Sequence, residues 1–132
     1  MSEVLVDTSA WIEFFRNPRS KCGAAVDLLL GEERVCTTPL VIVEVVSGAR
    51  NRSEFERLQK DFAALPQVDF PQTAWVDMLE SRWQLKRQGI TGISIPDLII
   101  AHVALAHRKA ILTQDQGFQR MQPVLKLSLV EV

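Results

Sequence analysis

The feature that most constrains the fold is a short apolar run, Val4–Val6, which ends in the carboxylate of Asp7. Two hydroxyl side chains, those of Thr8 and Ser9, follow immediately. This pattern predicts a strand that carries an acid at the carboxyl edge of a sheet, where open α/β sheets bind their ligands. Further along the chain, strand-like runs alternate with helical patterns. We therefore expect an α/β fold with a central parallel sheet, in a single domain over residues 1–132.

Hydrophobic periodicity and turn signals place the remaining elements. Strands are predicted at residues 4–6, 34–37, 68–70, 111–113 and 124–130, and helices from Ser9 or Ala10 to Asn17 and at residues 24–30, 40–46, 53–65, 73–88 and 94–108. The β-branched residues of segment 40–46 favour a strand. The Thr38-Pro39 start and the Ser47-Gly48 stop favour a helix, which is our prediction. Ser53 and Glu56 have the spacing of a capping box.

The net charge and the cysteine content limit which functions and which cellular compartments fit the chain. The net charge of −1 gives no overall basic field, so any phosphate recognition must come from local patches or a bound metal. Cys22 and Cys36, the only cysteines, form neither a disulfide framework nor a Cys-x-x-Cys pair, which favours a reducing compartment. The first residues do not resemble a signal peptide, and no apolar stretch is long enough to span a bilayer. We therefore expect a cytoplasmic protein without a membrane partner.

Four acids, Asp7, Glu44, Asp97 and Asp115, are the candidate catalytic and metal-binding residues, although each has a structural alternative. Asp7 has the position of a helix N-cap. Asp97 lies three residues after Ser94, which is again the spacing of a capping box. Asp115 follows a strand and resembles a common turn acid.

Glu44 is the only charge between residues 40 and 46. On a helix it shares a face with Val41 and Val45, so we expect it on the core side, where an unpaired carboxylate is costly. A structural salt bridge is the alternative to a metal or catalytic role.

The four acids support a metal-binding role more strongly as a group than any one of them does alone. If the strands before Asp7 and Asp115 are parallel neighbours, both acids face one crevice, which the helices of Glu44 and Asp97 can approach. Crowded carboxylates repel and raise one another's pKa values unless a cation lies among them. Hard oxygen ligands without Cys or His select Mg²⁺, or Mn²⁺, over zinc.

These residues resemble the PIN domain, and in particular the VapC-type toxin ribonucleases of bacterial toxin–antitoxin pairs. The resemblance rests on four segments in order, which are residues 4–11 with Asp7, 39–48 with Glu44, 95–101 with Asp97 and 111–118 with Asp115. It implies a three-layer α/β/α fold with a central parallel sheet, and Mg²⁺-dependent endoribonuclease activity. It also implies a cognate antitoxin, and either a homodimer or a dimer of toxin–antitoxin pairs. Many relatives carry a further acid where this chain has Gln116 and Gly117, so the resemblance does not extend to a second metal site.

The expected mechanism is in-line attack of water on an RNA phosphodiester. Asp7 and Asp97 hold the metal, and Asp115 and Glu44 contribute directly or through waters. Glu44 is the candidate to accept the proton of the water. The resemblance implies 5′-phosphate and 3′-hydroxyl products. Three supporting hydroxyls, on Thr8, Ser9 and Thr113, are placed to orient water, acids or phosphate, or to act only as caps and turns.

RNA contacts are expected from basic side chains at Arg16, Arg50, Arg82 and Lys86, although such stripes are usually solvated helix faces. The first helix is rich in large apolar side chains. An apolar groove there, beside an acidic pocket, would suit an antitoxin segment that inserts an arginine among the carboxylates.

Two other classes of protein are alternatives. A phosphoacceptor receiver domain is also a small parallel α/β module, but it needs paired acids after the first strand, and Asp7 has no acidic neighbour. A non-catalytic PIN-like RNA-binding module typically lacks one or more of the acids, and all four are present here. A DNA flap nuclease is disfavoured because the chain is short.

Overall fold

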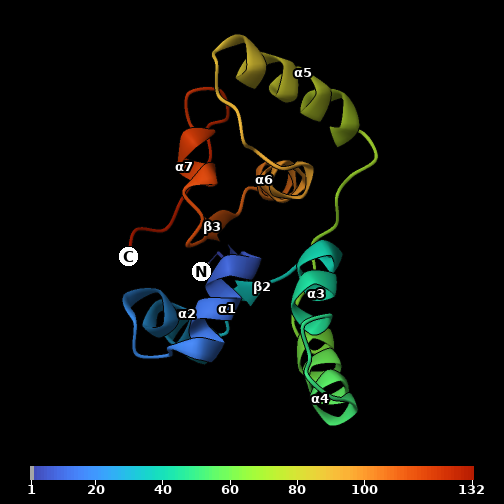
Figure 1. The fold of residues 1–132 in the computed structure, drawn as a ribbon, viewed down its shortest axis with the longest axis vertical. Coiled ribbons are helices and arrows are strands. Elements are labelled where there is room, and N and C mark those ends of the chain that lie inside the picture. The colour runs from blue at the N-terminus through green and yellow to red at the C-terminus, as the bar shows by residue number, and fades with distance from the viewer. Residues whose placement is uncertain (1) are drawn as a thin grey trace.

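The computed structural model describes residues 2–132 (Figure 1). Its centre is a parallel three-stranded sheet in the order β2-β1-β3, made of β1 (Val4–Val6), β2 (Val35–Cys36) and β3 (Ala110–Leu112). In the middle strand, Leu5 is paired with Cys36 on one side and with Ile111 on the other. Because all three strands run the same way, their carboxyl ends share one edge.

Helices cover the sheet. They are α1 (Thr8–Arg16), α2 (Lys21–Gly31), α3 (Pro39–Val46), α4 (Arg52–Ala63), α5 (Ala74–Arg87), α6 (Ile95–His107) and α7 (Gly117–Arg120). In Figure 1, α1 and α2 lie on one side of the sheet, α6 and α7 lie on the other, and α5 lies outside α6. Helices α3 and α4 pack side by side as a pair. This arrangement confirms the predicted α/β/α fold. Between residues 2 and 132, no helix combines the length and apolarity needed to cross a membrane.

The core explains why the strands read as unbroken apolar runs. All three residues of β1 are buried, and Leu5, Val6, Ile111 and Leu112 have no exposed surface. Strands of a parallel sheet are covered on both faces, which favours continuous rather than alternating hydrophobicity. The apolar side of α6 provides one cover, and its residues Leu98, Ile100, Ala101 and Val103 are fully buried.

Most predicted elements are present with shifted ends. The ambiguous segment 40–46 is helical, as α3. Helix α1 begins at Thr8, one residue before the predicted start, and α2 begins at Lys21, after the cap residue Ser20. The capping box at Ser53 and Glu56 is wrong. Asn51 caps α4 instead, and its side chain accepts a hydrogen bond from the Glu54 backbone N–H at 2.8 Å. Asn is among the strongest N-caps, and it leaves Ser53 inside the first turn.

The predicted strands at residues 68–70 and 124–130 are also wrong, although both segments run beside the sheet. Each forms a single parallel bridge, Thr37 with Gln67 and Ile111 with Leu129, with two backbone hydrogen bonds. Pro39 has no N–H to donate to the Val68 carbonyl, so the first pairing does not continue into residues 68–70. In the second segment, the Gln122 side chain bonds both the N–H and the C=O of Leu127, so the backbone joins the sheet only from residue 128.

Candidate active site

Three aspartates meet at the carboxyl edge of the sheet. Asp7 directly follows β1, Asp115 lies in the loop after β3, and Asp97 is in the first turn of α6. The Asp7 N–H donates to the Leu112 carbonyl at 2.9 Å, which ties the ends of β1 and β3 together. The negative charges of Asp115 and Asp7 both act on the carboxyl group of Asp97. Acids more than one hundred positions apart in the chain therefore share one site.

Asp7 is buried, with only 3% of its surface exposed. It occupies the N-cap position of α1, yet its side chain makes no capping bond. Instead, its Oδ2 accepts hydrogen bonds from Ser9 Oγ and Thr113 Oγ1, both at 2.8 Å. No ion pair among residues 2–132 involves this carboxylate. A buried carboxylate supported only by hydroxyls is an uncompensated charge, and a cation would neutralise it.

The loop after β3 aims Asp115 at the same edge. The Thr113 hydroxyl accepts a bond from the Asp115 backbone N–H at 2.9 Å while it donates to Asp7. The Asp115 Oδ1 accepts from the Gly117 N–H at 2.8 Å. A side chain at position 117 would bring its Cβ within 3.1 Å of that oxygen, so the tight turn favours glycine. Ser9 extends the network, because its Oγ accepts from the Gln114 N–H at 2.9 Å.

Asp97 carries the clearest electrostatic signature of the site. The pKa of Asp97 is raised from 3.8 to about 6, first by burial and then by the negative charge and the neighbouring carboxyl group of Asp115. Asp7 adds a weaker contribution of the same sign. Neighbouring carboxylates repel each other, and a cation placed between them would relieve that repulsion. Ser94 fixes the backbone here, since its Oγ accepts from the Asp97 N–H at 3.1 Å.

The expectation that Glu44 lies on the core side is wrong, because the residue is exposed. Helix α3 packs against α1 and α4 and buries Val41, Val45 and Val46, while Val43 and Glu44 face outward. The Glu44 carboxylate is not free, however, since the Thr8 hydroxyl donates to its Oε1 at 2.7 Å. Thr8 is the neighbour of Asp7, so Glu44 lies at the rim of the site rather than among the three aspartates.

The spacing and the chemistry of these side chains decide whether they can hold a metal ion. As they stand, no three acidic, histidine or cysteine side chains in the described part of the chain are spaced to hold one. The donor chemistry nevertheless fits a hard dication, because Asp7 is buried without an ion-pair partner among residues 2–132 and the negative charge of Asp115 raises the pKa of Asp97. Metal binding displaces protons from its carboxyl ligands. The side chains would have to move to bring the three carboxylates around one ion.

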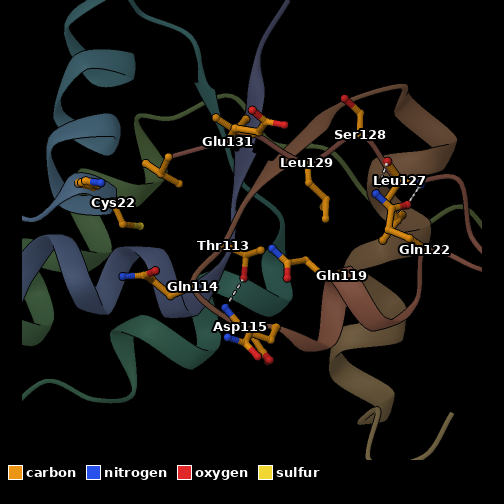
Figure 2. Close-up of a pocket in the computed structure, with 14 residues that line it drawn as sticks. Cys22, Thr113, Gln114, Asp115, Gln119, Gln122, Leu127, Ser128, Leu129 and Glu131 are labelled. Atoms are coloured by element: carbon orange, nitrogen blue, oxygen red, sulfur yellow. Dashed lines mark hydrogen bonds between the residues drawn. The ribbon is translucent and has the colours of Figure 1, made fainter.

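Two hollows adjoin the acids. A cleft of about 920 Å³ begins at Thr113 and Asp115 and runs to the C-terminal segment (Figure 2). The sequence reasoning missed this cleft, although its glutamines, at positions 114, 116, 119 and 122, are a visible signal. A groove of about 570 Å³ lies between α1, α3 and α4 and includes Glu44.

The predicted RNA-contact residues lie in different places. Arg16 and Arg50 line the groove between α1, α3 and α4, where Arg50 also pairs with Glu54 at 3.1 Å. Arg82 is partly buried and donates to the Ile93 carbonyl at 2.6 Å, which gives it a structural role. Lys86 is exposed on α5.

Comparison with known proteins agrees with this geometry. The sequence profile of the PIN domain matches residues 4–122. Ribonuclease VapC11 of Mycobacterium tuberculosis is 30% identical to the chain, over 94% of the chain and 95% of that protein. The structure of VapBC-1 from nontypeable Haemophilus influenzae superposes with a TM-score of 0.77 at 21% identity, covering 97% of this chain and 96% of the other. VapBC-5 from Mycobacterium tuberculosis, a member of the VapBC family of toxin-antitoxin systems, gives a TM-score of 0.71 at 22% identity and covers both chains completely.

Proposed function

This chain belongs to the PIN domain family, in its VapC-type branch, and we propose that it is a divalent-metal-dependent endoribonuclease. The observation that carries the proposal is the convergence of Asp7, Asp97 and Asp115 at one sheet edge, with Asp7 buried and the negative charge of Asp115 acting on Asp97. Such a cluster suits a reaction in which negative phosphate approaches negative side chains only with the help of a cation. The name of the Mycobacterium tuberculosis relative supports RNA as the substrate.

In this proposal Asp7, Asp97 and Asp115 hold the ion, which is Mg²⁺ or Mn²⁺ because the donors are hard oxygens without Cys or His. When bound, the ion supplies positive charge for the phosphate and makes water a stronger acid. The chain provides the positioning. Ser9 and Thr113 fix one oxygen of Asp7, and the Thr113 hydroxyl also fixes the backbone of Asp115.

Glu44 has the geometry of a proton acceptor. It is exposed at the rim, so substrate and water can reach it, and the bond from Thr8 holds its carboxylate toward the site. Its proposed role is to take a proton from the attacking water. In-line attack forms the bond from the water oxygen to phosphorus as the bond from phosphorus to the 3′-oxygen breaks. The leaving 3′-oxygen takes a proton from solvent, which gives a 5′-phosphate and a 3′-hydroxyl.

The test is cleavage of a mixed RNA pool with Mg²⁺, with Mn²⁺ and with EDTA, by the wild type and by Asp7→Asn. Asp27→Asn, an exposed acid on α2, is the matched control. We expect cleavage by the wild type and the control with either metal, and none with EDTA or with Asp7→Asn. Undiminished cleavage by Asp7→Asn or in EDTA would refute the metal mechanism. A wild type that binds RNA without cutting it would favour the non-catalytic PIN-like module.

We also propose that the protein is the toxin of a toxin–antitoxin pair, which its similarity to VapBC-5 supports. The groove between α1, α3 and α4 is the proposed antitoxin site. It carries Ile12 and Phe15, which are 40% and 49% exposed, beside Arg16 and close to Glu44. Phe15→Glu should release the antitoxin in a pull-down and leave RNA cleavage intact. Retention of the antitoxin by this variant would contradict the assignment.

A homodimer is proposed through α5. Trp75, Val76, Leu79 and Trp83 expose 46–71% of their surfaces on that helix, and a contiguous apolar patch of this kind marks a protein interface. Leu79→Lys should shift the protein from dimer to monomer in sedimentation analysis. A wild-type protein that sediments as a monomer would remove this proposal.

A further inference from the structure

We propose that the cleft beside Asp115 is a nucleobase subsite, in which Gln116 and Gln119 read the edge of an unpaired base next to the scissile phosphate. The inference rests on the proposed ribonuclease function and adds a determinant of substrate choice. It assigns a role to a part of the chain that the metal site and the proposed antitoxin groove leave unused.

The position of the cleft supports this role. One end is formed by Thr113 and Asp115, which belong to the acidic site, and the other by the segment from Leu127 to Val132 (Figure 2). Its volume of about 920 Å³ lies within the roughly 300–1,000 Å³ typical of small-ligand sites. A nucleotide whose phosphate lies at the aspartates can therefore place its neighbouring base in the cleft.

Two of the four glutamines that line the cleft are available to a ligand. Gln114 donates to Glu13 at 2.8 Å, and Gln122 uses both ends of its carboxamide on Leu127 at 2.9 Å. Gln116 and Gln119 are exposed, and their side chains bond no other residue in the part of the chain that the structure describes. Figure 2 shows the Gln119 carboxamide in the open middle of the cleft, on the side of Thr113.

The chemistry of the cleft selects a base over a phosphate. A carboxamide presents a donor and an acceptor side by side, which matches the edges of nucleobases, and single-stranded RNA is recognised through such edges. Leu129 and Val130 add apolar surface on which a flat ring can lie. Asp115 and Glu131 are negative and only Lys21 among the lining residues is positive, so a second phosphate is disfavoured there.

The experiment compares base preference rather than activity alone. Short RNAs with randomised positions around the cut are digested with Mg²⁺, and the ends are sequenced, for the wild type, Gln116→Ala/Gln119→Ala and Gln59→Ala. Gln59 is an exposed glutamine on α4 outside the cleft and serves as the control. We expect the wild type and the control to prefer one base at a fixed distance from the cut. The double variant should lose about tenfold of that preference while it still cleaves the pool.

A second variant tests the subsite without shortening any side chain of the cleft. Gln119→Glu keeps the shape of the side chain but replaces its donor with an acceptor. It should therefore change which base is preferred rather than only weaken the preference. The inference is overturned if all variants share the wild-type preference, or if the wild type cleaves with no preference at any position. If the wild type cuts no RNA, the proposed function fails as well, so the two failures are distinguishable.

Discussion

The carboxyl pair of Asp97 and Asp115 makes a prediction about folding that can be tested without any substrate. The pKa of Asp97 is raised from 3.8 to about 6 by burial and then by Asp115. Between these two pH values the folded protein keeps a proton that the unfolded chain has released. The stability that this proton contributes is fully present below about pH 3.8 and is lost as the pH rises through about 6.

The size of the effect follows from the shift. At about 1.36 kcal/mol per pKa unit, the raised value corresponds to at most about 3 kcal/mol. Asp97 is partly exposed, so solvent screening reduces the figure to about 1–2 kcal/mol. Asp97→Asn also loses a favourable interaction with the N-terminus of α6, worth about 0.3–1 kcal/mol. We therefore expect Asp97→Asn to raise the free energy of unfolding of the metal-free protein by about 1 kcal/mol at neutral pH, and to give no gain near pH 4.

Urea unfolding in EDTA, followed by tryptophan fluorescence over about pH 4 to 8, measures this difference. The same measurement with Mg²⁺ at about one hundred times its Kd should stabilise the wild type by about 2.7 kcal/mol and the variant by much less. Asp27→Asn is the control for removal of a surface charge. A stability difference between Asp97→Asn and the wild type that does not change with pH would refute the raised pKa of Asp97.

Three further predictions concern the hydroxyls around Asp7, the rim residue Glu44 and the buried His102. Ser9→Ala and Thr113→Val each remove a hydrogen bond to Asp7 and should lower the affinity for Mn²⁺, measured by calorimetry, by about 10- to 100-fold. An unchanged affinity would show that these hydroxyls do not support metal binding. Glu44→Gln should lower kcat for RNA cleavage by about 10²- to 10⁴-fold without changing the urea midpoint, because the side chain is exposed, and an equal loss of stability would point to a structural role. Burial lowers the pKa of His102 below its ordinary 6.5. The stability that the neutral imidazole contributes is therefore lost as the pH falls below about 6.5. His102→Gln should flatten that part of the wild-type stability profile. A His102→Gln profile that still falls with the wild-type slope would show that the fall has another origin.

The sequence patterns were most reliable where local signals and burial agree. The run Val4–Val6 before Asp7 is a buried strand, and Ser94 and Pro96 open the helix that carries Asp97. A shared crevice for Asp7 and Asp115 required the strands before them to be parallel neighbours, and β1 and β3 are paired in that way. These features depend on short segments whose apolar content and caps are visible in the sequence.

Features that depend on tertiary contacts were not predictable in the same way. Glu44 was expected on the core side because its neighbours are apolar, but α3 packs on one side only and Val43 is 62% exposed. The segments 68–70 and 124–130 have strand-like composition, yet each finds a single pairing partner at the sheet edge. The glutamines at positions 114, 116, 119 and 122 are visible in the sequence, but they line a cleft only because the C-terminal segment folds back beside Asp115, and that tertiary contact has no local signal.

A crystal structure grown with Mn²⁺, with the ion located by its anomalous scattering, is the most direct test of the account. We predict one strong manganese peak within coordination distance of the Asp7 and Asp97 carboxylates, with the Asp115 carboxylate beside it. A saturated crystal without a manganese peak at this edge of the sheet would contradict the central claim.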